Sequence, residues 1–152
     1  MAILPLKDDN VLKRISFQYV TVGLIVACAG VFLWQLSLGE NQGRAALQFG
    51  AIPSVLFGAR NLAPDLCVIP PYLTLFTSVF LHGGWMHLLF NMLFLWVFGD
   101  NVEDSMGHVR YLVFFLITGA IAAFAHAALE HGSSAPLIGA SGAISAILGA
   151  YL

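Results

Sequence analysis

A serine among small residues is the first feature with chemical potential. Residues 136–152, PLIGASGAISAILGAYL, carry no charge, yet Ser141 stands there between Gly139 and Gly142. A hydroxyl in lipid finds no water to bond with, so it is by default a candidate functional group. Small residues spaced four apart, as Ser141 and Ser145 are, also let two membrane helices pack closely. This pattern alone leaves both interpretations open.

A histidine and an asparagine form the second candidate pair. His87 and Asn91 are four residues apart in an apolar stretch, so they lie about 40° apart on one helix face, whereas His82 points elsewhere. Burying either group without a partner costs several kcal/mol, on the order of 2–7. The pair therefore indicates either a functional site or a hydrogen bond that holds two helices together.

Composition places these residues in a membrane. Apolar residues make up 59% of the 152 residues and charged residues 9%, whereas a soluble domain carries about 25% charged residues. The expected partner is therefore the lipid bilayer. The net charge is −2 without a basic cluster, which argues against nucleic acid.

The apolar segments predict an all-α membrane protein, a polytopic helical bundle. Spans of about 20 apolar residues are expected at residues 19–38, 82–98, 111–129 and 136–152. We expect residues 39–81 to be partly structured at the outer interface, because long structureless connections are unusual in compact bundles. Residues 99–110 and 130–135 are expected to be loops.

Basic residues predict the orientation. Lys7, Lys13 and Arg14 precede the first span, so residues 1–18 are expected to be a cytoplasmic segment, followed by a transmembrane domain over residues 19–152. The second and fourth spans then both begin outside, and Ser141 is expected about one turn past the start of the fourth. The hydroxyl, imidazole and carboxamide would meet at similar depth in the outer half of the membrane.

Two stretches resemble the rhomboid family of intramembrane serine proteases. FLHGGWMHLLFNMLFLWVFGDNVED, residues 80–104, contains the His-x-x-x-Asn pattern of that family's second helix. GASGAISAILGAYL, residues 139–152, contains the Gly-x-Ser-Gly pattern of its fourth helix. Gly-x-Ser-Gly alone is weak, but the two patterns in this order on alternate spans are specific. The resemblance implies a rhomboid-like fold with about four of six expected helices.

The resemblance also implies roles for these residues. Ser141 would be the nucleophile, and His87 and Asn91 would stabilise the oxyanion, while Gly139 and Gly142 would make room for the substrate backbone. The implied protein is a multi-pass bacterial inner-membrane endopeptidase that cuts membrane-anchored proteins near the outer face. It needs no cofactor and no metal.

The base of that family has no counterpart here. It is a histidine on the sixth helix, and we expect this chain, incomplete at its C-terminus, to be inactive alone. The remaining histidines are expected on the wrong faces, depths or sides: His82, His108, His126 and His131. Ser145 stands where many relatives carry a tyrosine.

Two other classes of function are considered. A non-catalytic rhomboid-like protein would bind transmembrane clients, although the intact Ser141 and His87 patterns argue against it. A transporter or metal-handling protein would use His82, His87 and His126. A transporter would show internal repeats, which the sequence lacks, and a metal site needs more ligands than His87 and Asn91 supply.

Overall fold

The structure is a bundle of helices. The computed structural model describes residues 12–152, and within that range the only strand-like feature is an isolated pairing of Ala51 with Leu137. This confirms the all-α class. The predicted segment 1–18 is described only from residue 12, because Lys7 and its neighbours lie outside the described residues. The α-helices are α1 (Tyr19–Ser37), α2 (Gln42–Phe49), α3 (Pro53–Leu56), α4 (Thr74–Thr77), α5 (Trp85–Met106), α6 (His108–Leu129) and α7 (Ser141–Tyr151); the 3₁₀ helices are η1 (Gly39–Asn41), η2 (Pro71–Leu73) and η3 (Ser78–Phe80).

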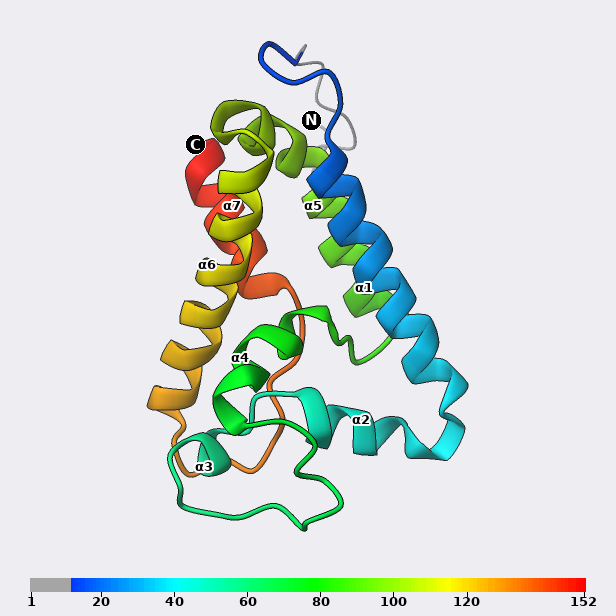
Figure 1. The fold of residues 1–152 in the computed structure, drawn as a ribbon, viewed down its shortest axis with the longest axis vertical. Helices are drawn as coiled ribbons and strands as arrows, with labels where there is room; N and C mark the ends of the chain where they lie inside the picture. The colour runs from blue at the N-terminus through cyan, green and yellow to red at the C-terminus, as the bar shows by residue number, and fades with distance from the viewer. Residues whose placement is uncertain (1–11) are drawn as a thin grey trace.

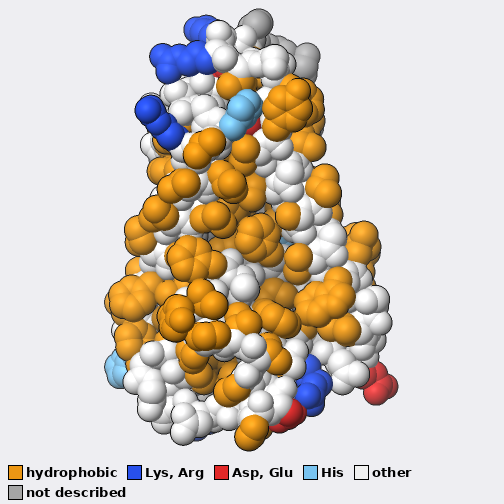
Figure 2. Space-filling model, viewed as in Figure 1, with side chains coloured by type: hydrophobic (Ala, Val, Ile, Leu, Met, Phe, Trp, Pro, Cys, Tyr) orange, Lys and Arg blue, Asp and Glu red, His pale blue; other side chains and the backbone are white. Residues whose placement is uncertain are grey.

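The long helices run between two polar ends. The start of α1 and the end of α7 lie at one end of the bundle, and α2 and α3 lie at the other (Figure 1). Figure 2 shows hydrophobic side chains over the middle of the visible face and charged or histidine side chains near the two ends. An apolar band between polar ends is what a bilayer requires.

Two helices are long and apolar enough to cross a membrane within the described part of the chain. They are α1 and α6, which confirms the first and third expected spans. Pro71–Phe80 and Trp85–Met106 form a third only as a pair, bent by 81°. The fourth expected span is not present as one helix in the described residues, because residues 136–140 are not helical and α7, from Ser141 to Tyr151, is an apolar helix of only 11 residues.

The expectation that residues 99–110 form a loop is wrong. Helix α5 continues to Met106, and Gly107, with φ +79°, joins it directly to α6 at His108. Its charged residues suggested a loop, but Glu103 is fully buried because it binds the start of α1. Its carboxylate accepts the backbone N–H groups of Val20 and Thr21, at 2.9 and 2.8 Å. Tertiary contact therefore overrides local polarity.

The segment at residues 39–81 is partly structured, as expected, and contains six short helical elements. Ala51 and Leu137 exchange two backbone hydrogen bonds of 3.1 and 2.8 Å, and Ser54 N–H donates to Ser133 at 2.9 Å. These bonds hold the non-helical approach to α7 against this segment. They fix where α7 begins.

Candidate active site

The backbone segment that leads to Ser141 passes close to two side chains of α5. Gly139 has φ +117°, and a Cβ there would lie 2.5 Å from His87 Nε2 and 3.8 Å from Asn91 Nδ2. Only glycine fits, for both conformation and space. The Gly139 N–H donates to the Ser78 carbonyl at 2.8 Å, which holds the backbone in place.

Ser141 is the first residue of α7, not one turn inside the helix as expected. The first N–H groups of a helix have no intrahelical acceptor, and the helix dipole favours negative charge there. The Ser141 side chain is exposed. Among residues 12–152 its hydroxyl makes no hydrogen bond, while its carbonyl accepts the Ser145 hydroxyl at 2.8 Å. The nucleophile candidate is therefore open at a helix start.

A contact with Gly83 selects between the two tautomers of the His87 ring. The Gly83 N–H lies 3.4 Å from His87 Nδ1. A peptide N–H can only donate, so Nδ1 accepts and the ring proton is assigned to Nε2. Nε2 is the ring atom that a Cβ on Gly139 would meet most closely. His87 thus directs a donor N–H toward the segment before Ser141.

Asn91 supplies a second donor. It is 7% exposed, and its Nδ2 is buried without a hydrogen-bond partner among the described residues. An unsatisfied buried donor costs about 1–3 kcal/mol. Such a group is available to a ligand at no loss of an existing bond. The structure therefore brings Gly139, His87 and Asn91 together immediately before Ser141.

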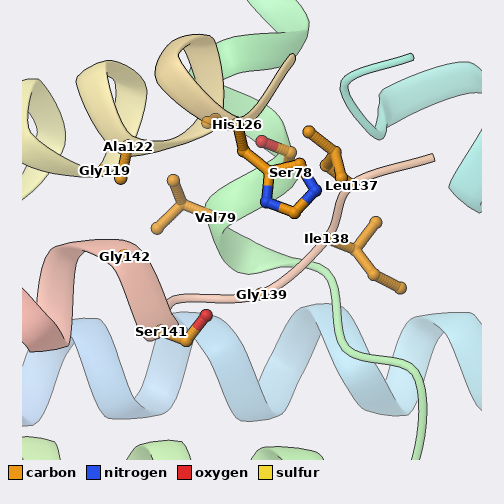
Figure 3. Close-up of a pocket in the computed structure, with 11 residues that line it drawn as sticks. Ser78, Val79, Gly119, Ala122, His126, Leu137, Ile138, Gly139, Ser141 and Gly142 are labelled. Atoms are coloured by element: carbon orange, nitrogen blue, oxygen red, sulfur yellow. The ribbon is translucent and has the colours of Figure 1, made fainter. Parts of the chain in front are cut away.

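A cavity of about 270 Å³ opens beside Ser141 (Figure 3). Its floor on α6 is made of small residues, including Gly119 and Ala122. Gly142 lines it too, but a Cβ on Gly142 would lie 2.5 Å from Ala122 Cβ. Gly142 therefore also allows α7 to approach α6 closely, so its packing role is visible in the structure.

The expectation that His126 is not placed to act as the base stays a prediction. Its ring lines the same cavity as Ser141 (Figure 3). Its Nε2 lies 3.9 Å from the Glu130 carboxylate, and no hydrogen bond joins it to Ser141 in the described part of the chain. Ser78 also lines this cavity, and no motif in the sequence pointed to it.

The other histidines are distributed around the bundle. His82 is 2% exposed, with its ring centre 5.1 Å from that of His87. His108 is hydrogen-bonded to Glu103 at 2.6 Å, at the opposite end of α5. His131 is exposed in the turn after α6. The described residues contain no group of three or more metal-ligating side chains able to hold a metal.

Ser141 begins α7 inside an apolar helical bundle, two residues after Gly139, where a Cβ would meet His87 and Asn91 of α5. Residues 71–152, more than half of the chain, match the family model described as the Rhomboid domain. The chain belongs to the rhomboid family, and it is an all-α membrane protein.

Curated relatives carry the same family name. Over 140 residues the chain is 34% identical to the rhomboid protease GluP of Bacillus subtilis (strain 168), covering 90% of this chain and 24% of that protein. Over 130 residues it is 28% identical to the rhomboid protease GlpG of Klebsiella pneumoniae (strain 342), covering 85% and 41%. The chain thus spans less than half the length of these relatives.

Proposed function

We propose that the chain is part of an intramembrane serine endopeptidase, in which Ser141 attacks a peptide carbonyl of a membrane-anchored protein. The observation that carries this proposal is the close approach of the Gly139 backbone to His87 Nε2 and Asn91 Nδ2. Gly139 in turn stands two residues before Ser141, an exposed serine at a helix start. The rhomboid proteases among its relatives support the same reaction.

The geometry supplies stabilisation of the oxyanion. When Ser141 Oγ bonds to the carbonyl carbon, the carbonyl oxygen gains negative charge. His87 Nε2–H, Asn91 Nδ2–H and the free N–H groups at the start of α7 are the donors available to it. Each such donor is worth about 2.7–4 kcal/mol of the barrier. Gly139 and Gly142 leave the substrate backbone room to approach.

The base is the missing part. A serine hydroxyl attacks only when a base takes its proton, and within residues 12–152 no imidazole is hydrogen-bonded to Ser141. His87 is committed as a donor through its Nδ1 contact with Gly83. We therefore propose that residues 1–152 alone do not complete the reaction and that the base belongs to another part of the full-length protein.

The proposed setting is the bacterial inner membrane, with the N-terminus in the cytoplasm and the site near the outer face. Lys13 and Arg14 support this orientation, because basic residues favour the cytoplasmic side. They are held at the start of α1, where Asp104 accepts the N–H groups of Lys13, Arg14 and Ile15 at 2.7–2.9 Å. Transmembrane proteins are the proposed substrates.

The test is cleavage of a transmembrane substrate by the full-length protein in lipid vesicles. Ser141→Ala should abolish cleavage and labelling by a fluorophosphonate, because both need this hydroxyl. Ser145→Ala is the matched control, since that hydroxyl bonds only the Ser141 carbonyl, and should retain most of the activity. Cleavage that survives Ser141→Ala contradicts the proposal.

The same experiment with residues 1–152 tests the missing base. We expect no cleavage and no robust labelling of Ser141. Strong labelling would show that a base already reaches Ser141 within this part of the chain. A full-length protein that binds transmembrane segments without cutting them would favour the non-catalytic alternative.

A further inference from the structure

Gln35 is a buried polar residue near the end of α1. Both polar atoms of its carboxamide are hydrogen-bonded to the backbone of a single residue. The side chain is 5% exposed. Its Oε1 accepts the His82 N–H at 3.0 Å, and its Nε2 donates to the His82 carbonyl at 3.3 Å. The amide thus pairs with both backbone groups of His82, as a neighbouring strand would.

The His82 ring is fixed as well. Its Nδ1 lies 3.2 Å from the Phe80 carbonyl, which can only accept, so this nitrogen carries the proton. The ring is buried and meets the His87 ring edge to face, at a centroid distance of 5.1 Å. The turn between η3 and α5 is therefore held at His82 by backbone and side chain together.

The next residue carries this constraint into the site. Gly83 follows His82, and its N–H is the group that contacts His87 Nδ1. The placement of that N–H depends on the His82 backbone. A displaced Gly83 N–H would leave Nδ1 free to take the proton, and the neutral ring would then present an acceptor to Gly139.

We propose that Gln35 is a positioning residue for His87: it holds the His82 backbone so that the Gly83 N–H fixes the ring proton of His87 on Nε2. This inference rests on the proposed function, in which that proton is donated to the oxyanion. It assigns α1, which supplies none of the proposed catalytic groups, a direct influence on the chemistry of α5.

The tautomer of His87 can be measured without any catalysis. We would label the protein with ¹⁵N-histidine and record ring ¹⁵N signals at alkaline pH in micelles, assigning His87 by its loss in His87→Ala. The unaltered protein should show His87 protonated on Nε2. Gln35→Met, which keeps the size but removes both hydrogen bonds, should give a mixture of tautomers.

Thr21→Val is the matched control on the same helix. It removes a 2.7 Å hydrogen bond between α1 and Glu103 of α5, at the opposite end from His87. A merely structural role for Gln35 predicts that both variants lower the unfolding temperature and leave the His87 signals unchanged. The positioning role predicts that only Gln35→Met changes them.

The full-length protein gives the second measurement. Gln35→Met should lower kcat for a transmembrane substrate by roughly tenfold, less than the 10²–10³-fold of losing an oxyanion donor outright, with little change in KM. Thr21→Val should keep kcat. Unchanged His87 signals in Gln35→Met would overturn the positioning role. Altered signals without an effect on kcat would support it and would instead overturn the donor role of His87.

A second pair of variants tests the inference if the Gln35→Met protein does not fold. Gly83→Pro removes the N–H itself and should redistribute the His87 proton. Gly83→Ala keeps the N–H, and its Cβ would meet Ile138 and His87 only at 3.7 and 3.8 Å, which is ordinary contact. Identical His87 signals in the two variants would overturn the inference.

Discussion

Helix α5 carries buried polar groups near both of its ends, and the hydrogen bonding of these groups differs between the two ends. At the Glu103 end, the carboxylate receives hydrogen bonds from the Val20 and Thr21 N–H groups, the Thr21 hydroxyl and His108. At the His87 end, Asn91 Nδ2 has no partner among the described residues.

The difference separates structural polar groups from available ones. A buried group whose bonding capacity is used stabilises the fold, whereas an unused donor costs stability and calls for an explanation. By this criterion Glu103 holds α1 and α5 together. Asn91 keeps a buried donor that no described residue uses. Three predictions would break or sharpen this contrast.

The largest effect is expected for Asn91→Leu. Removing the unpaired donor should lower kcat of the full-length protein about 10²–10³-fold, because the oxyanion loses a hydrogen bond. The unfolding temperature should stay constant or rise, since no existing bond is lost. Cleavage assays and thermal unfolding in micelles check both. A strong loss of stability would show that Asn91 is a structural group after all.

Glu103→Ala should have the converse effect. It leaves the Thr21 N–H and hydroxyl without their acceptor in a fully buried place, so the unfolding free energy should fall by about 3 kcal/mol. Denaturant titration in micelles measures this loss. In the full-length protein, the molecules that remain folded should keep their labelling by a fluorophosphonate. Glu103→Gln, which keeps one acceptor, should be intermediate.

The smallest effects compare two glycines with positive φ, one at each end. Gly107 has open space around a Cβ, so Gly107→Ala should cost only backbone strain, of order 1–3 kcal/mol. Gly139→Ala should cost more, because the same strain is joined by a contact of 2.5 Å between the new Cβ and His87 Nε2, which must move. The unfolding free energy should therefore fall further in Gly139→Ala, and activity should fall only in that variant. Equal activities would contradict the tight contact.

Long apolar runs predicted the first and third spans well, because each is helical from end to end. The sequence could not show that residues 99–106 are helical, since the reason is the distant start of α1 that Glu103 and Asp104 bind. It could not show that α7 starts as late as Ser141 either, because the backbone pairing of Leu137 with Ala51 delays it.

The candidate site shows the same division. The four-residue spacing of His87 and Asn91 and the glycines beside Ser141 identified the residues that the structure brings near one another. The tautomer of His87 depends on Gly83, and the neighbourhood of Ser141 includes His126 from α6. Neither contact follows from a helical period, because each joins a helix to a segment outside it.

Gly107 is the whole connection between α5 and α6. Helices joined by so short a turn are necessarily antiparallel neighbours. Once both helices are formed, neither can be moved away from the other at this end, because a single residue links them. In the folded protein α5 and α6 therefore move together at this end of the bundle, and lengthening the joint would let either helix shift without the other.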